Sequence, residues 1–479
     1  MSPGADLAVV WEMVLSQLSR SAEVLHMILS FLGPNGIDES VLKNGALLSN
    51  TPALRFLDAQ KELLQGSLIR KSGESGIIYM PMFVQRAVIC RMSAAQREEI
   101  FLLSIAILAA NISDTYSTDI GHQVASWTKC ENILPHVESI MSKGAESNIF
   151  QGENQQFAEL LLRYSWCVQH IIPEIASLMR NRYLYERENY SVARSCVDIA
   201  LQKFVNKDSL AYASAVDLGG LIDLDICHPS AALEAFQQAY TIRKSILPSD
   251  ALFLAASQVN LGLALTEIGE FEKAHAYLQQ SIDIRITHNS DRIGNSYSNM
   301  ASLLLRMGQP GDAEAMLKRC PSLKDFSDDT FLQTGNPRFS GDMVVLSRIR
   351  YAQGLHYEAL KLASKALSFR RQCSSGRLKV CDSLYQVSVI HHEADNLQVA
   401  QECIMISEAL PQAEGLGHLA RANHKVSHFL ASLGKSKESK LQFKKAVNIR
   451  QEFIKLHGDD FLVNAVSSDF ESLVPWMLW

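Results

Sequence analysis

A small residue recurs about every 40 positions from residue 193 onward, and this period constrains the fold more than any other feature of the sequence. Successive spacings are 39, 42, 39, 46, 41 and 39 residues. A period of roughly 20–50 residues is typical of arrays in which each unit buries its apolar face against its neighbours. The sequence therefore predicts about seven repeat units, with the small residue at Ala193, Ala232, Ala274, Ala313, Ala359, Ala400 and Ser439.

The clearest unit spans residues 260–281 and predicts two helices joined at Gly269. A small residue at Gly262 allows the second helix to approach the first closely, and Ala274 does the same from the other side. Leu278 is then placed to fill the seam between them. This is the helix–turn–helix pattern of a tetratricopeptide repeat (TPR).

The spacing exceeds the roughly 34 residues of a minimal TPR, so we expect longer helices, similar to repeats of the kinesin light chain type. The longest interval contains a run of prolines, glycines and aspartates over residues 321–341, which predicts an exposed insertion. Stacked units form a right-handed solenoid whose first helices line a concave surface. That surface is the expected binding site for a protein or peptide partner.

The repeat register places a set of polar and aromatic side chains on the concave side. Asn260 and Asn299 occupy equivalent positions in successive units, where amides can pair with the backbone of an extended peptide; packing or capping is the alternative. The charge of the set is mixed, and no Lys/Asn carboxylate clamp is visible. The partner-binding candidates are Asn260, Glu267, Ser298, Asn299, Arg306, Arg348, Tyr351, Tyr385, His392, Arg421, His424 and His428.

Histidine pairs are the nearest approach to a metal or catalytic motif. His424 and His428 stand four residues apart, a spacing that can hold zinc on one helix face, and His391 and His392 are adjacent. A third ligand is missing, and the HExxH glutamate is absent. The sequence also lacks a GxSxG elbow and a matched nucleophile and base. We therefore expect no metal, no cofactor, no catalytic residue and no enzymatic activity.

Composition favours a folded, helical chain. Hydrophobic residues make up 47% of the sequence, glycine and proline number only 25 and 13, and alternating strand-like runs are nearly absent. The predicted fold class is all-α: a TPR-type α-solenoid with a small N-terminal winged-helix-like domain. The predicted divisions are a winged-helix-like domain (1–95), a helical connector (96–173), the repeat array (174–455) and a C-terminal cap (456–479).

Net charge and the search for targeting signals limit the classes of partner that we expect. The net charge of −6 gives no strong positive field, so nucleic acid is a disfavoured partner. The nine cysteines are scattered without a CxxC pair, which is typical of buried thiols in a reducing compartment. No signal peptide is visible, and apolar runs are shorter than the roughly 20 residues of a membrane span. We expect a cytoplasmic protein, with the nucleus not excluded and no membrane partner.

The first 95 residues predict helices followed by one hairpin. Residues 24–31 indicate a helix that ends at a Gly-Pro-Asn-Gly turn, and residues 54–64 indicate another. Residues 67–69 and 77–79 then flank a Gly- and Ser-rich turn. Helices followed by a hairpin indicate a winged helix, the only region where we expect strands.

Several N-terminal motifs resemble the winged-helix segment and connector that follow the nucleotide-binding domain of fungal NB-ARC/TPR receptor-like NTPases. They are Val10-Trp11-Glu12, Phe31-Leu32-Gly33-Pro34-Asn35-Gly36-Ile37, Ser67-Leu68-Ile69, Phe83-Val84-Gln85-Arg86-Ala87-Val88, and the Trp127, Cys130-Glu131 and Ile133-Leu134-Pro135-His136-Val137 run. The resemblance implies a sensor half that binds a partner in its solenoid, accessory to fungal recognition or specialised metabolism.

Two departures separate this chain from those receptors. It contains no GxxxxGK(S/T) phosphate loop, so we expect no nucleotide. Pro81 also stands where the family tends to have a nucleotide-facing histidine. One alternative is a transcription regulator that contacts DNA through Arg70, Lys71, Arg86 and Arg91; another is an enzyme of unrecognised type.

Overall fold

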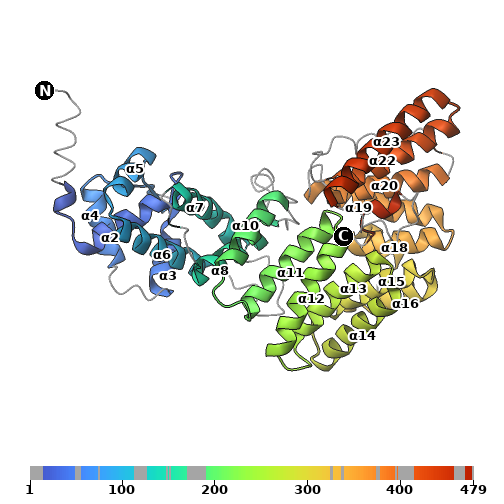
Figure 1. The fold of residues 1–479 in the computed structure, drawn as a ribbon, viewed down its shortest axis with the longest axis horizontal. Coiled ribbons are helices and arrows are strands. Elements are labelled where there is room, and N and C mark those ends of the chain that lie inside the picture. The colour runs from blue at the N-terminus through green and yellow to red at the C-terminus, as the bar shows by residue number, and fades with distance from the viewer. Residues whose placement is uncertain are drawn as a thin grey trace. The chain divides into compact units, whose positions relative to one another are not determined.

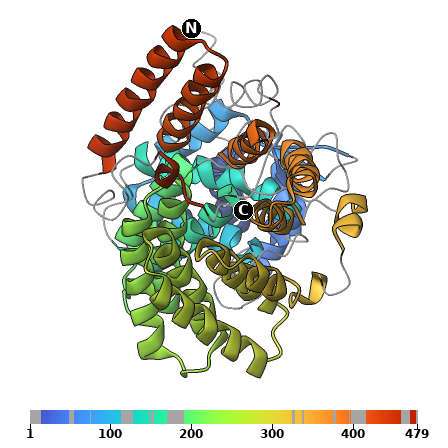
Figure 2. The same ribbon diagram turned by 90° about the vertical axis from the view of Figure 1, so that its right-hand side faces the viewer.

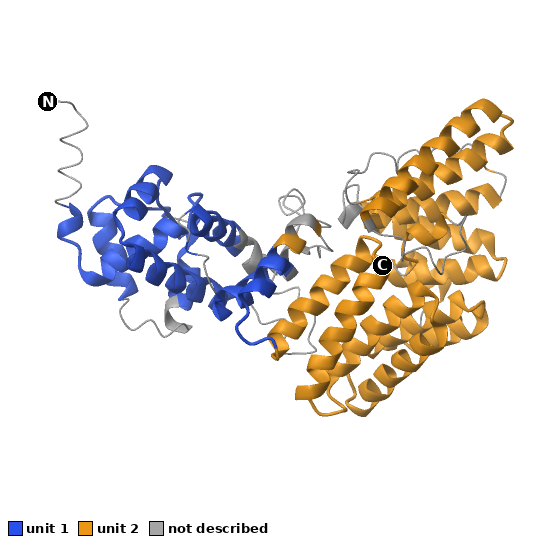
Figure 3. Cartoon of the chain, viewed as in Figure 1, with its two compact units in different colours: residues 1–168, 196–207 blue, residues 169–195, 208–479 orange. Residues whose placement is uncertain are grey.

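Helices dominate the computed structural model of the chain (Figure 1), and the predicted all-α fold class is confirmed. The chain divides into two compact units, residues 1–168 with 196–207 and residues 169–195 with 208–479 (Figure 3). The structure describes residues 14–48, 55–73, 76–112, 127–146, 149, 153–169, 190–323, 327–335, 339–373, 378–393, 396, 415–457 and 470–476.

Unit 1 combines helices with one small antiparallel sheet of strand order β1-β3-β2. Ser19 caps the N-terminus of α2 through its side chain, and Ser93 with Gln96 forms a capping box at α6. The elements are α2 (Arg20–Phe31), β1 (Ile37–Asp38), α3 (Glu39–Leu48), α4 (Phe56–Gln65), β2 (Arg70–Lys71), β3 (Ile77–Tyr79), α5 (Met82–Arg91), α6 (Ala94–Asn111), α7 (Trp127–Glu146) and α8 (Gln155–Gln169).

The predicted hairpin is confirmed, but its first strand lies at Arg70–Lys71 and not at residues 67–69. The reason is the end of α4: Ser67 adopts a positive φ of 54°, and the Leu68 N–H donates to the carbonyl of Leu63. Leu68 and Ile69 are buried, so their apolar character anchors the turn in the core. The third strand, β1, was not predicted from the sequence.

The C-terminal end of α2 is held by side chains from two other helices. Gln85 on α5 donates through Nε2 to the carbonyls of Leu29 and Leu32, at 3.1 and 3.0 Å. Lys143 on α7 donates to the carbonyls of Ser30 and Leu32, at 2.8 and 3.0 Å. These bonds satisfy carbonyls that a helix end leaves without internal partners. Burial lowers the pKa of Lys143 to about 8.

Unit 2 is a succession of antiparallel helix pairs. In Figure 2 these helices, green to red, surround the short C-terminal 3₁₀ turn η6 (Glu471–Leu473) and the segment that follows it. The helix α10 (Tyr190–Lys203) straddles the division between the units. The pairs are α11 (Leu210–Asp225) with α12 (Pro229–Ile246), α13 (Leu252–Ile268) with α14 (Phe271–Thr287), α15 (Ile293–Arg306) with α16 (Pro310–Leu317), α18 (Ser340–Ala352) with α19 (His356–Cys373), and α22 (Leu416–Ser432) with α23 (Ser436–His457), while α20 (Leu378–Glu393) stands between the last two.

The repeat positions predicted from the sequence are confirmed where the structure describes them. The alanines at 193, 232, 274, 313 and 359 are fully buried, the Ser439 hydroxyl donates to the Ser427 carbonyl at 2.8 Å, and Ala400 lies outside the described residues. A Cβ at Gly262 would come within 2.6 Å of Leu278 Cγ, so this glycine does permit the close helix contact. The turn glycines Gly269, Gly308, Gly354 and Gly434 all have positive φ.

The described part of the predicted insertion is mostly exposed or half-buried, as expected, but it is not a loop throughout. A 3₁₀ turn, η2 (Pro321–Leu323), and a helix, α17 (Asp328–Gln333), follow α16. Phe331 is only 3% exposed. Arg350 on α18 bonds Asp328 and Glu314, each at 2.8 Å, and lowers the pKa of Glu314 to about 2. This guanidinium therefore fastens a segment whose composition alone indicated a loop.

Candidate functional site

The predicted groove residues all lie on the first helices of the pairs or on α20, and several of them meet one short segment, residues 470–476. This segment, which we call the tail, belongs to unit 2. Figure 2 shows its dark red trace on the inner side of the surrounding helices. In the structure, the candidate surface therefore contacts a segment of the chain itself.

Trp476 contacts three helices. Its backbone N–H donates to Glu267 Oε2 on α13 at 2.9 Å, and its backbone carbonyl accepts a hydrogen bond from Arg348 on α18. The guanidinium carbons of Arg348 and of Arg306 on α15 lie 4.6 and 5.7 Å from the centroid of the indole ring. Such cation–π contacts contribute about 0.5–1 kcal/mol each at exposed sites and more when desolvated.

The start of the tail has two further anchors. The Tyr385 hydroxyl on α20 donates to the carboxylate of Glu471. The His424 ring on α22 stacks on Phe470, with centroids 4.1 Å apart and planes 13° apart. Burial, followed by the charge of Glu471, raises the pKa of Tyr385 well above its usual value. The hydroxyl thus stays protonated and keeps its role as donor.

Gly417 on α22 allows the tail to lie against that helix. A Cβ at this position would overlap the carbonyl oxygen of Leu473. Leu473 is fully buried in a cluster that includes Phe453 on α23 and Cys227, which follows α11. Cys227 Sγ also lies 4.0 Å from His418 Nδ1. The turn after α11 therefore meets α22, and the solenoid of unit 2 closes on itself beside the tail.

Asp382 on α20 organises the arginines and was missed by the sequence reasoning. Its buried carboxylate accepts bonds from Arg348 at 3.0 Å and Arg421 at 3.1 Å, and Arg370 approaches to 3.9 Å. Burial alone would raise the pKa of Asp382, but these three positive charges outweigh it and hold the pKa below its usual value. A usable signal existed: Asp382 lies one helical turn before Tyr385, on the same face.

The two asparagines are used within the solenoid. Asn260 donates to both carboxylate oxygens of Asp217 at 3.1 Å, and Asp217 also pairs with Arg243 at 3.3 Å. Asn299 is buried, and its Oδ1 has no hydrogen-bond partner among the described residues. Their placement fits the packing alternative better than contact with a peptide. Ser298 donates to Asp342 at 3.2 Å.

The contacts of the remaining candidates are with other side chains of the solenoid. Tyr351 packs edge-to-face with His356 at 5.2 Å, and His392 stacks on Phe429 at 4.6 Å. His428 is exposed, with its Nε2 atom 3.3 Å from that of His424. Within the described part of the chain, no group of three His, Cys, Asp or Glu side chains is arranged to hold a metal.

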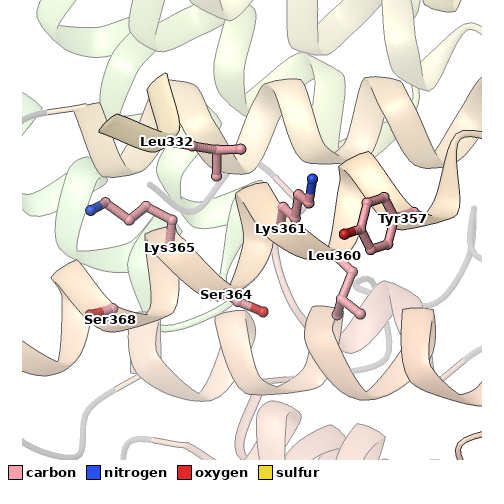
Figure 4. Close-up of a pocket in the computed structure, with 7 residues that line it drawn as sticks. All are labelled: Leu332, Tyr357, Leu360, Lys361, Ser364, Lys365 and Ser368. Carbon is pink, nitrogen blue, oxygen red and sulfur yellow. The ribbon is translucent and has the colours of Figure 1, made fainter. Parts of the chain in front are cut away.

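A hollow of about 520 Å³ lies over α19, the second helix of its pair, and beside α17 (Figure 4). Figure 4 shows Lys361 and Lys365 along its length, with Tyr357 at one end. Both ammonium groups are engaged with rings: Lys361 with Tyr357 at 4.2 Å and Lys365 with Phe369 at 4.8 Å. It shares no residue with the concave site, and its lining is that of a shallow, solvated surface.

Family models match both parts of the chain. One described as a domain of unknown function (DUF7779) matches residues 13–97, and the tetratricopeptide repeat model matches residues 229–287 and 253–320. With the helix pairs of unit 2, the repeat match confirms the predicted TPR-type fold. No curated protein matches the chain. Within the described residues, no helix has the length and apolar character that a membrane crossing requires.

Similar solved structures include a signal transduction ATPase with numerous domains (STAND) and a TPR sensor, from Pyrococcus horikoshii, at 13% identity and TM-score 0.40. The alignment covers 93% of this chain but 65% of that protein. A Rap protein complexed with competence and sporulation factor gives 13% identity and TM-score 0.46 over 77% of this chain and 95% of that one. Kinesin light chain-like repeats of a Podospora anserina protein give 19% and 0.31 over 43% and 96%.

Proposed function

We propose that this chain is a non-catalytic partner-binding protein whose solenoid holds an extended segment of another protein on its concave face. The observation that carries the proposal is the grip on Trp476. One side chain, Glu267, accepts from its backbone N–H, another, Arg348, donates to its carbonyl, and its ring lies against Arg348 and Arg306. Backbone bonds of this kind give affinity for any extended peptide, and the ring contact adds selectivity.

The site is built before a ligand arrives, which favours binding. Asp382 fixes the Arg348 guanidinium through one nitrogen, and the other nitrogen remains available for a peptide carbonyl. The ion pair with Asp382 at 3.0 Å restrains the Arg348 side chain, so it loses less freedom when it binds. A preorganised donor contributes more affinity because less ordering entropy is lost.

We also propose that unit 1 contains a winged-helix-like domain and that the chain corresponds to the sensor part of an NB-ARC/TPR receptor-like protein, accessory to a fungal recognition or specialised-metabolite pathway. The order of helix, strand, two helices and hairpin supports the domain proposal. DNA binding by this region has less support. Lys71 lies 2.5 Å from Glu39, which also pairs with Lys43 at 2.6 Å, so part of the small basic footprint is neutralised.

Affinity capture of the full chain from the cells that naturally make it tests the proposed function. The variant Arg306→Ala removes a concave guanidinium, and Arg371→Ala, at an exposed position near the end of α19, is the matched control. We expect specific proteins to be lost from Arg306→Ala and retained by Arg371→Ala, with equal circular dichroism spectra. If both variants capture the same proteins as the unaltered chain, the concave face is not the partner site.

A further inference from the structure

We propose that the tail, residues 470–476, is an intramolecular competitor for the partner site, and that the partner presents an aromatic side chain that replaces Trp476 against Arg306 and Arg348. This inference rests on the proposed function and specifies its ligand. It assigns the chain two states, one with the concave site filled by its own tail and one with the site open to a partner.

The tail covers several of the predicted partner-binding residues on the concave side. Phe470 contacts α22, and Glu471 contacts α20. Trp476 contacts α18, α15 and α13. The residues beneath it are shielded: Tyr385 is 7% exposed and Arg421 is 5% exposed. An external segment cannot reach Glu267 or Arg348 in the same geometry while Trp476 is in place.

The length of chain between α23 and Phe470 sets how far the tail can reach. Twelve residues, 458–469, separate the last residue of α23 from Phe470. At about 3.3–3.6 Å per residue, such a stretch spans at most about 45 Å. A tethered segment of this length competes at an effective concentration on the order of millimolar. The apparent affinity for a free peptide is therefore reduced by the fraction of molecules whose site is open.

The open site keeps its shape because its charges are satisfied from within. Arg348 and Arg421 remain paired with Asp382 when the tail departs. The losses on opening are the two backbone bonds of Trp476, its ring contacts, the bond between Tyr385 and Glu471, the stack of Phe470 on His424 and the burial of Leu473. A partner segment with an aromatic residue recovers the Trp476 contacts, which offsets part of this loss.

Fluorescence anisotropy of a labelled peptide with the sequence of residues 470–476, Phe-Glu-Ser-Leu-Val-Pro-Trp, tests the competition on the full chain. Trp476→Ala weakens the internal tail and leaves every groove residue in place. We expect it to bind the free peptide at least tenfold more tightly than the unaltered chain. Phe83→Ala, which removes an aromatic ring that is 72% exposed in unit 1, is the control and should match the unaltered chain.

Two further arms fix the site and the ligand. Adding Arg306→Ala to Trp476→Ala should reverse most of the gain, and a peptide with alanine in place of its tryptophan should not bind Trp476→Ala. Equal binding by the unaltered chain and Trp476→Ala would overturn the competition but leave the proposed function intact if Arg306→Ala still weakens binding. Failure of folded Trp476→Ala to bind the peptide at all would overturn the assignment of an aromatic ligand, whereas the capture experiment tests the proposed function independently.

Discussion

Two buried carboxylates, Asp217 on α11 and Asp382 on α20, lie on different helices of unit 2 and show how a purely structural cluster differs from the proposed binding site. Asp217 pairs with one arginine, Arg243, and accepts two bonds from Asn260. Arg243 also donates to the hydroxyls of Ser257 and Ser214, at 2.7 and 3.1 Å. The carboxylate of this cluster is satisfied by groups from neighbouring helices, although Arg243 Nε has no hydrogen-bond partner among the described residues.

Asp382 faces three arginines, and the surplus of positive charge is what reaches the tail. Arg348 shares its guanidinium between Asp382 and the carbonyl of Trp476. Arg421 lies 4.0 Å from the centre of the Tyr385 ring, whose hydroxyl bonds Glu471. The difference is that a guanidinium of the Asp382 cluster reaches the tail, whereas the bonds named for the Asp217 cluster stay within the helices.

The largest expected effect comes from neutralising each carboxylate. Asp382→Asn removes the counter-charge that Arg348, Arg421 and Arg370 share, and breaking a buried pair costs about 3–5 kcal/mol. Asp217→Asn should cost about 1–2 kcal/mol less, because Arg243 keeps two hydroxyl partners. Urea denaturation followed by circular dichroism compares the two. Equal losses of unfolding free energy would show that both clusters are purely structural.

The repeat array could be predicted from the sequence, whereas the tail could not. Small residues such as Ala274 and turn glycines such as Gly269 act locally, so their spacing alone indicates helix pairs. The contact between Trp476 and Glu267 joins residues far apart in the chain and depends on the superhelix, which periodicity does not specify. The described tail packs on α22 and α23 through Phe470 and Leu473, but it also extends across the concave face.

The groove candidates illustrate the same limit. The repeat register predicted that Arg306 and Arg348 lie on helices of the concave side, because side-chain direction follows the helical period. It could not separate Arg348, which holds the tail, from Asn260, which bonds Asp217, since both face the same side. The partner of each polar group is set by neighbouring helices, and this information is absent from a single helix pattern.

Gly417→Ala tests the Asp382 side of the comparison, because it should release the tail without altering any charge. Its new methyl group overlaps the Leu473 carbonyl, whereas alanine is otherwise favourable in a helix. We expect hydrogen exchange at the Trp476 amide, which Glu267 protects, to accelerate at least tenfold. Gly311→Ala on α16, where a Cβ meets nothing within 4 Å, is the matched control. An unchanged exchange rate would mean that the tail tolerates displacement from α22.

Acid should weaken the Asp382 cluster through His418. Burial, followed by the charge of Arg421, lowers the pKa of His418 to about 3, well below its ordinary 6.5. Between these values the unfolded chain binds a proton that the folded chain does not, so stability falls as the pH drops from about 6.5 toward 3. His418→Gln should reduce this slope in urea denaturation at stepped pH, while the part that comes from other buried histidines with lowered pKa, such as His26 and His136, remains. His428→Gln, at an exposed position on α22, should leave the slope unchanged; a flattening there too would remove His418 as the cause.

The smallest expected effect isolates one hydrogen bond of the tail. Tyr385→Phe removes the hydroxyl that bonds Glu471 and keeps the ring beneath Arg421. Because Glu471 is exposed, we expect a loss of about 1 kcal/mol, equivalent to an approximately fivefold faster exchange at the Trp476 amide. Tyr357→Phe on α19, outside the concave site, should have no effect. A Tyr385→Phe change as large as that of Gly417→Ala would show that the hydroxyl, and not the packing of Leu473, holds the tail in place; no change would mean that Trp476 alone determines docking.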